Sequence, residues 1–317
     1  MGLEIRGVSK LFGSKTAVDN ISFQINEPSV VGFLGPNGAG KTTTMRMITG
    51  YLAATEGEVA IDGLRVDQAH VGLRSKIGYL PESNPLYTEM EVHEYLKFAA
   101  QLSGLDAAAT SQRLEFVVER CGLREVLYDP IYRLSKGYKQ RVGLAQAMIH
   151  DPEILILDEP TSGLDPNQVI GIRGLISELA KEKFVVLSTH ILSEVQALCN
   201  RVLIINRGKL VLDATADELK HRNTGLLSIV VKTELPAEKV AETFEKALEP
   251  NRCSAKKSGG NVNVQLSLKD SDEVRERAFD LCVSNNFKML GLSNSGTDLE
   301  NIFRELTLGS DETGQQQ

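Results

Sequence analysis

A hydrophobic run long enough to span a bilayer is missing from this sequence of 317 residues. A membrane-spanning helix needs roughly 18 consecutive apolar residues, and no run approaches that length. The N-terminal stretch MGLEIRGVSK does not have the pattern of a signal peptide. It also lacks the Ser or Thr that a myristoylation signal carries at its sixth position. The chain is therefore not expected to enter a membrane by itself.

Cysteine is scarce, and positive charge is not in excess. The four cysteines, at positions 121, 199, 253 and 282, form no CxxC pair, so neither a zinc site nor a redox motif is indicated and reduced thiols are expected. Lys and Arg total 35 against 42 for Asp and Glu, a formal net charge of −7. The chain as a whole therefore has no electrostatic attraction for nucleic acid. Its composition is otherwise that of a globular protein.

The stretch GFLGPNGAGKTTTMRM, residues 32–47, has the residues that a phosphate-binding loop needs. Gly35, Gly40, Lys41 and Thr42 fit the pattern GxxxxGK[ST], in which glycines let backbone N–H groups close on phosphate oxygens. The lysine of that pattern reaches the terminal phosphates, and the Thr42 hydroxyl can ligate Mg²⁺. A buried-strand run, VVGFL, precedes the loop and a helix is predicted over 42–49. This context favours a phosphate site over an ordinary glycine-rich turn.

Short apolar runs recur along the chain and alternate with helix-like segments. They are KIGYL (76–80), EILILD (153–158), FVVLST (184–189) and RVLIIN (201–206). Continuous apolar runs of this length are typical of parallel strands buried on both faces, with helices as the crossovers. Residues 3–25 instead alternate apolar and polar side chains around a glycine-containing turn, which predicts antiparallel strands.

Two carboxylates, Asp158 and Glu159, end the EILILD run. The run predicts a strand that delivers them to the carboxyl edge of a parallel sheet, where open α/β sheets bind ligands. Asp158 is expected in the Mg²⁺ shell, and Glu159 is expected to polarise an attacking water. The alternative is a solvated pair of carboxylates at a strand end. The four apolar residues before the pair, and the lack of a nearby cation after it, weigh against that alternative.

The run RLSKGYKQR, residues 133–141, is the third candidate element. Ser135 is a good N-cap for the helix predicted to follow, and a helix N-terminus with a hydroxyl attracts anions. A capped helix is the commoner explanation of such a run when it stands alone. Beside a phosphate-binding loop it predicts a second phosphate-binding surface.

Two other regions have patterns of their own. Between residues 83 and 151 the pattern is helical, with Val92, Leu96, Ala99 and Leu102 on one stripe, which predicts a helical insert within the α/β domain. After about residue 221 the order becomes strand, helix, two strands, helix and strand, as in a split βαβ domain. A short helix over 298–306 and a disordered tail over 309–317 are predicted to follow.

In sequence order these motifs resemble those of the ATP-binding subunits of ABC transporters. GPNGAGKT is similar to the Walker A motif, LSKGYKQR to the signature helix and LILDEP to Walker B. SGLDP, residues 162–166, is similar to the D-loop, and the STH that ends at His190 to the switch histidine. The resemblance covers residues 2–221. The C-terminal part resembles the extra domain of the exporter-type subgroup, which includes gliding-motility and drug-efflux ATPases.

The resemblance implies a set of site residues. Glu159 and His190 would be catalytic, and Thr42, Asp158 and Glu82 would hold Mg²⁺. The residues that would bind ATP are Phe12, Gly35, Pro36, Asn37, Gly38, Ala39, Gly40, Lys41, Thr42, Thr43, Ser135 and Gly137.

Some of these ATP contacts involve a second subunit or an open alternative. In the family, Ser135 and Gly137 would touch the γ-phosphate held by the opposite subunit, so two copies would enclose two ATP molecules head to tail. Phe12 falls where the family stacks an aromatic ring on adenine. A core phenylalanine is the alternative for that position.

The sequence departs from the family pattern at three positions. Glu82 stands where the family commonly has Gln, so the segment that senses the γ-phosphate carries a charge. Lys136 and Tyr138 replace the usual Gly and Gln of the signature, whereas Ser135 and Gly137 remain for the phosphate contact.

The implied fold is an α/β P-loop NTPase of the ABC type with an antiparallel β subdomain and a helical insert, plus a small α+β, split-βαβ-like C-terminal domain. An ATP-binding domain is expected over 1–223, with its helical subdomain over about 83–151, and an accessory domain over 224–308. The implied function is an ATP-hydrolysing motor that drives export by ATP-dependent dimerisation. Its partners would be an integral-membrane permease and a second copy of the chain, with no nucleic acid. The location would be cytoplasmic, at the inner face of the cell membrane.

Two other functions are compatible with an ABC-type ATPase. One is work on DNA or ribosomes, and the other is a nucleotide-gated scaffold without turnover. DNA-repair members carry a long coiled coil between Walker A and the signature, but here only 135 − 41 = 94 positions separate Lys41 from Ser135. Translation-factor relatives pair two ATPase domains in one chain, and this chain has one. The scaffold is disfavoured because all the expected catalytic side chains are present. The transported cargo is not predicted.

Overall fold

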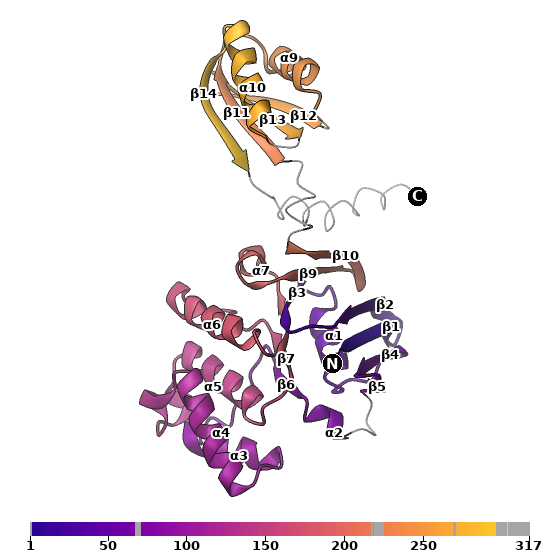
Figure 1. Cartoon of the computed structure of the whole chain (residues 1–317), viewed down its shortest axis with the longest axis vertical. Coiled ribbons are helices and arrows are strands. Elements are labelled where there is room, and N and C mark those ends of the chain that lie inside the picture. Colours follow the sequence, from indigo (N-terminus) through magenta and orange to yellow (C-terminus); the bar gives the residue numbers. More distant parts are fainter. Residues whose placement is uncertain are drawn as a thin grey trace. The chain divides into compact units, whose positions relative to one another are not determined.

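The computed structural model describes residues 2–66, 71–216, 218, 225–250, 252–268, 271–295 and 303. The chain divides into two compact units, Met1–Thr215 and Ala216–Gln317 (Figure 1). The domain boundary expected at 223/224 lies outside the described residues. Within the described ranges, no helix combines the length and apolarity needed to cross a membrane.

The first unit is built on a six-stranded sheet in the order β10-β9-β3-β8-β7-β6. Its strands are β3 (Ser29–Leu34), β6 (Ile77–Leu80), β7 (Ile154–Asp158), β8 (Phe184–Thr189), β9 (Arg201–Asn206) and β10 (Lys209–Thr215). All are parallel to their neighbours except β10, which returns antiparallel along β9. The apolar runs therefore form the parallel strands that the sequence predicts, because layers on both faces bury them.

The register of this sheet aligns three strand ends at one edge. Leu34 at the end of β3 pairs with Thr189 at the end of β8, and Asp158 at the end of β7 pairs with Ser188. The segments that leave β3, β7 and β8 therefore start at the same level. That carboxyl edge is where open α/β sheets bind their ligands.

A second, antiparallel sheet lies beside the first, in the order β2-β1-β4-β5, as the alternation in residues 3–25 predicts. Its strands are β1 (Leu3–Phe12), β2 (Lys15–Ile25), β4 (Glu56–Ile61) and β5 (Leu64–Arg65). Helix α1 (Lys41–Ile48) contributes Met45, Met47 and Ile48 to the core between the sheets. Phe23 and Phe33, with ring centroids 5.9 Å apart, join the two sheets there.

Three α-helices of the first unit form the helical insert. The insert comprises α3 (Val92–Leu102), α4 (Ala107–Arg120) and α5 (Lys136–Met148), which cluster on one side of the sheet (Figure 1). Besides α1, the other α-helices in the described part of this unit are α2 (Val71–Arg74), α6 (Pro166–Leu179) and α7 (Leu192–Leu198). The predicted stripe on α3 is wrong at Leu102, which is 72% exposed. Leu102 is the last residue of its helix, so its side chain projects past the packed part of the insert.

The second unit is a four-stranded antiparallel sheet in the order β12-β13-β11-β14 with two helices on one face. Its elements are β11 (Gly225–Lys232), α9 (Ala237–Leu248), β12 (Arg252–Ser258), β13 (Asn261–Leu268), α10 (Asp272–Ser284) and β14 (Lys288–Ser295). This is the element order that the sequence predicts. Phe244 and Phe287 stack in its core with centroids 6.4 Å apart. Phe303 aside, the helix predicted over 298–306 and the tail over 309–317 lie outside the described residues.

Candidate functional site

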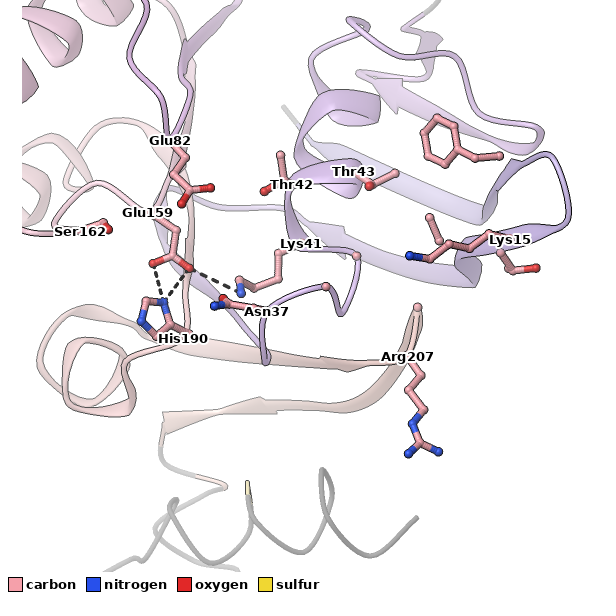
Figure 2. A pocket seen from close by; sticks show the side chains of 16 residues that line it. Lys15, Asn37, Lys41, Thr42, Thr43, Glu82, Glu159, Ser162, His190 and Arg207 are labelled. Carbon is pink, nitrogen blue, oxygen red and sulfur yellow. Dashed lines mark hydrogen bonds and ion pairs between the residues drawn. The ribbon is translucent and has the colours of Figure 1, made fainter. Parts of the chain in front are cut away.

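A pocket of 770 Å³ lies beside the segments that follow β3, β7 and β8 (Figure 2). Ten of its lining residues are among those singled out from the sequence: Phe12, Asn37, Gly38, Gly40, Lys41, Thr42, Thr43, Glu82, Glu159 and His190. Six others are Lys15, Thr16, Ala17, Ser162, Arg207 and Gly208. The structure thus gathers residues from widely separated stretches of sequence around one cavity.

Two glycines of the loop after β3, Gly35 and Gly40, have close backbone neighbours. A Cβ at Gly40 would lie 2.6 Å from the carbonyl oxygen of Ala17, and the φ of Gly40 is 109°. A Cβ at Gly35 would lie 2.5 Å from the carbonyl oxygen of Ile205. Only glycine meets both the conformational and the steric demand at position 40. The loop is therefore held tightly between β2 and β9.

Helix α1 presents a positive end to the pocket. It starts at Lys41 and has no acidic residue in its first turn, so the N–H groups and dipole of that turn are not compensated locally. The Lys41 side chain is only 7% exposed, and its Nζ donates to the carbonyl oxygen of Gly35 at 2.8 Å. An ammonium and a helix N-terminus at one loop make a site for a phosphate group.

The Glu159 carboxylate forms the opposite wall of the pocket. Its backbone has a φ of 50°, which turns the chain sharply after β7, and its N–H is 3.1 Å from Ser188 Oγ and 3.2 Å from the Ser188 carbonyl oxygen. The Nδ1 atom of His190 lies 3.0 and 2.9 Å from the two carboxylate oxygens, and Lys41 Nζ lies 3.5 Å from one of them (Figure 2). Because carboxylate oxygens accept hydrogen bonds, this geometry places a hydrogen on Nδ1. The arrangement leaves Nε2 of His190 available for another contact.

The Asp158 carboxylate is fully buried at the end of β7. Its Oδ1 accepts the hydroxyl hydrogen of Ser188, whereas its Oδ2 has no hydrogen-bond partner within the described part of the chain. A buried carboxylate oxygen without a partner has capacity left for a cation. The hydroxyl of Thr42 and the carboxylate of Glu82 line the adjacent pocket.

The donor set near Asp158 suits Mg²⁺ better than a transition metal. One or two carboxylates and a hydroxyl leave coordination positions for phosphate and water oxygens, and Mg²⁺ is usually bound in this way.

The ring of Phe12 lines the pocket and is 50% exposed, which rejects the alternative that it is a core residue. Lys10 supports this ring. Its Nζ lies 5.3 Å from the ring centroid and donates to the carbonyl oxygen of Ala53 at 2.7 Å. A cation in that position is attracted to the aromatic ring.

Ser135 and Gly137 are not part of the pocket formed by their own chain. Ser135 caps α5, and its hydroxyl oxygen accepts from the N–H of Tyr138 at 3.3 Å. Gly137 is buried against the side chain of Gln168, which a Cβ would approach to 2.4 Å. The capping role inferred from the sequence is confirmed. The two residues lie outside the cavity that contains Lys41.

Sequence reasoning missed part of the lining. The turn after Phe12 is directly followed by Lys15, Thr16 and Ala17. Because Phe12 was expected to contact adenine, their position in the sequence could have indicated that they line the same pocket. Arg207 and Gly208 form the turn between β9 and β10. No motif marks that turn, and only the pairing of β9 with β3 brings it to the loop.

Three comparisons with known proteins identify relatives of this chain. Residues 18–162 match the protein family described as "ABC transporter". The bacitracin transport ATP-binding protein BcrA of Bacillus licheniformis is 33% identical over 304 residues, which cover 95% of this chain and 96% of that protein. The linearmycin resistance ATP-binding protein LnrL of Bacillus subtilis (strain 168) is 31% identical over 311 residues, which cover 96% and 98% of the two chains.

A solved structure, the dimeric structure of MJ0796, a bacterial ABC transporter cassette, is similar with a TM-score of 0.62 and 25% identity. The similarity covers 67% of this chain and 98% of that one. The fold and the pocket together define a P-loop ATPase of the ATP-binding cassette type. The chain belongs to the family of ABC transporter ATP-binding proteins.

Proposed function

We propose that this chain is the motor subunit of an ABC exporter, in which ATP binding joins two copies of the chain and Mg²⁺-dependent ATP hydrolysis separates them. The observation that carries the proposal is that Lys41, Thr42, Glu159 and His190 line one pocket. These are the types of side chain that phosphoryl transfer to water requires: a cation, a metal-binding hydroxyl and a base held by a partner.

ATP enters this proposal with its phosphates at the loop of residues 35–43 and its adenine at Phe12. The first turn of α1 and the ammonium of Lys41 contact the β- and γ-phosphates. Phe12 stacks on the adenine, with Lys10 behind the ring. Lys15 lies at the same pocket and adds positive charge beside the triphosphate.

Hydrolysis depends on the buried carboxylates. Thr42, Asp158 and Glu82 would hold Mg²⁺, which would neutralise negative charge on the phosphates. Glu159 takes a proton from the attacking water, and His190 orients the carboxylate through Nδ1. The Nε2 atom of His190 then contacts the γ-phosphate. ADP and inorganic phosphate are the products.

A second copy of the chain completes the site. Ser135 and Gly137 are outside their own pocket, and Ser135 heads a helix whose N-terminus attracts anions. In a head-to-tail dimer these residues contact the γ-phosphate bound by the partner copy. The structure solved for MJ0796 is dimeric, which supports a dimer of this chain as well.

Export is the direction suggested by the relatives. BcrA is named for bacitracin transport and LnrL for linearmycin resistance, and both match this chain over nearly its whole length, including the second unit. The permease would be a separate membrane protein, and the chain would work at the cytoplasmic face of the cell membrane. The second unit would be an accessory domain over 224–308, without a part in the nucleotide chemistry.

Replacement of Glu159 by Gln tests the proposal, because it keeps the size of the side chain and removes the base. Turnover should fall by about 10² to 10⁴. ATP binding should persist because Lys41, Thr42 and Asp158 are unchanged. Light scattering after size-exclusion chromatography should show a dimer with ATP and a monomer without it. Glu153→Gln is the matched control, because Glu153 lies just before the opposite end of β7 and its side chain is 48% exposed.

Two results would contradict this proposal. Undiminished turnover of the Glu159→Gln protein would remove Glu159 from the role of base. A Glu159→Gln protein that binds ATP and remains monomeric would contradict the homodimer. Co-purification from native membranes, followed by identification of the bound membrane protein, tests the permease partner.

A further inference from the structure

Glu194 is a buried carboxylate that lies outside the pocket. It belongs to α7, which begins two residues after His190, and it is only 2% exposed. It does not line the pocket, and none of the sequence motifs includes it. Burial of a carboxylate is costly unless hydrogen bonds or a countercharge compensate it. The groups that contact Glu194 therefore indicate the role of this buried carboxylate.

The two oxygens of Glu194 accept hydrogen bonds from two different segments of the site. Oε1 accepts the hydroxyl hydrogen of Thr161, which is two residues after Glu159. Oε2 accepts that of Thr189 at 2.7 Å, and Thr189 directly precedes His190. One carboxylate thus connects the segment after β7 with the segment after β8.

Both segments are further tied next to their site residue. The Oγ1 atom of Thr189 also accepts from the N–H of Ile191 at 3.0 Å. This hydrogen bond therefore joins the residue before His190 to the residue after it. The N–H of Ser162 donates to the carbonyl oxygen of Glu159 at 3.1 Å, which folds the chain back at Thr161. A shift of either threonine would therefore be passed to the adjacent site residue.

Arg173 on α6 supplies the nearby positive charge. Its Nη2 lies 4.0 Å from Glu194 Oε1, and its Nε is buried without a hydrogen-bond partner in the described part of the chain. The carboxylate is therefore held by two hydroxyls and faces one guanidinium. This arrangement fixes the side chain in one position, as a support for a precise contact requires.

We infer that Glu194 is a positioning residue for hydrolysis, which sets the contact between His190 and Glu159 by joining the two segments through Thr161 and Thr189. The inference rests on the proposed function, because it takes Glu159 and His190 as the pair that acts on the attacking water. Rates of positioned reactions are sensitive to small displacements, and a shift of about 1 Å can cost about a hundredfold. A residue that only stabilised the fold would not affect the pair in this specific way.

The test uses variants that remove one hydroxyl or one acceptor at a time. Thr161→Val and Thr189→Val keep the side-chain shape and lose the hydroxyl. Thr161→Ser and Thr189→Ser keep the hydroxyl and serve as conservative rescues. Glu194→Gln replaces one acceptor oxygen by a donor, so that only one of the two hydroxyls keeps its acceptor.

A matched control is available on the helical insert. Thr110 of α4 is buried, and its hydroxyl donates to the Leu105 carbonyl oxygen at 3.5 Å, far along the chain from the pocket residues. Thr110→Val therefore removes a buried threonine hydroxyl without touching the two segments. Any loss of kcat that it shows measures the general effect of such a substitution.

Three measurements are made on each full-length variant: kcat for ATP hydrolysis, the equilibrium Kd for ATP, and the tautomer of His190. The tautomer is read from long-range ¹H–¹⁵N correlations of histidine-labelled protein. The chain has five histidines, and His190 is assigned by the loss of its signals in His190→Ala. In the parent protein the hydrogen should be on Nδ1.

We expect kcat to fall about ten- to a hundredfold in Thr161→Val, Thr189→Val and Glu194→Gln. The Kd for ATP should not change, and the Nδ1–H tautomer should give way to a mixture. The serine variants and Thr110→Val should behave as the parent protein. If Glu194→Gln does not fold, the two valine variants carry the test, since each leaves the other hydroxyl contact in place.

The inference is overturned if the valine variants retain the parent kcat and the parent tautomer. An inactive parent protein, or a Glu159→Gln protein with full activity, would instead contradict the proposed function. The tautomer of His190 would still decide whether Glu194 positions that ring. The two failures are therefore distinguishable.

Discussion

The Nζ atom of Lys41 lies 3.5 Å from Oε1 of Glu159, and both side chains are almost completely buried. The loop after β3 thus places a cation against the anion that follows β7. In a buried pair each charge depends on the other, because removal of one partner leaves the other uncompensated. Lys41 accordingly stabilises the carboxylate of Glu159 as well as the expected phosphates.

Lys41→Ala should weaken ATP binding and abolish turnover. It removes a charge-assisted contact to phosphate worth about 1.5 to 3 kcal/mol, or roughly a 10- to 150-fold rise in Kd. Equilibrium binding of a fluorescent ATP analogue measures the change. Lys181→Ala is the control, because that side chain is 70% exposed and remote from the pocket lining. Equal affinity of the Lys41→Ala and parent proteins would refute the phosphate site.

Phe12→Ala should raise the Kd for ATP by about 5- to 150-fold, the equivalent of the roughly 1 to 3 kcal/mol that stacking of a base on an aromatic ring contributes. Phe12→Tyr should retain most of the affinity. Tyr51→Ala is the matched control, since Tyr51 is an exposed aromatic residue outside the pocket. An unchanged affinity in Phe12→Ala would exclude adenine stacking at this position.

Much of the site could be predicted because its residues end buried strands or lie in the loop that follows one. Gly35, Lys41, Asp158 and His190 each follow or end an apolar run, and parallel strands bring their carboxyl ends to one edge. The apolar runs likewise predicted the strands themselves. Each of these patterns can be recognised within a short stretch of sequence, and the parallel sheet then places the strand ends at one edge.

The remaining features depend on contacts that no local pattern encodes. Arg207 reaches the pocket because β9 pairs with β3. A glutamate in the first turn of a helix, such as Glu194, is usually solvated, so its burial is visible only when Thr161 and Thr189 are seen beside it. The exposure of Leu102 was missed for the converse reason, because helical spacing does not reveal which turns another element covers.

Gly78→Ala should destabilise the first unit. A Cβ at this position of β6 would lie 2.0 Å from the carbonyl oxygen of Ala147, and this is backbone of α5 that cannot move freely. Overpacking of this kind costs about 1 to 3 kcal/mol. Urea unfolding followed by circular dichroism should show a lower midpoint.

The helical glycine Gly174 gives the opposite expectation to Gly78. A Cβ there meets nothing within 4 Å, so Gly174→Ala should stabilise α6 by about 0.5 to 1 kcal/mol. A Gly78→Ala protein as stable as the parent would show that β6 and α5 can separate without cost. Both variants use the same unfolding assay.

The stability of the first unit should decrease as the pH falls through about 6.5, the usual pKa of histidine. Burial lowers the pKa of His150, and the neighbouring Arg113 and Lys183 add to this effect. Below that pH the unfolded chain binds a proton that the folded chain resists, so protonation favours unfolding. Above it, both states are neutral at this residue and the contribution is constant.

His150→Gln should make the unfolding midpoint less dependent on pH in this range, because Gln does not titrate. The side chain of His150 contacts the carbonyl oxygen of Ile77 through Nε2 at 3.1 Å, and the amide of Gln can also donate to a carbonyl. Urea midpoints measured for both proteins between about pH 5 and 8 give the comparison. Parallel curves would show that His150 does not cause the dependence.

The in-register ends of β3, β7 and β8 also determine where the chain can be lengthened. Successive side chains of a strand point to opposite faces of the sheet. One residue inserted inside β8 would therefore reverse the faces of the residues on one side of the insertion, either Ser188 and Thr189 or the residues of β8 that precede them. The turn at Lys181 and Glu182, which precedes β8 at the amino edge, bears no such constraint, and Lys181 is exposed. An engineer who wishes to add an affinity tag or a fluorescent reporter within the ATPase unit should therefore choose that turn, and keep every segment at the carboxyl edge at its natural length.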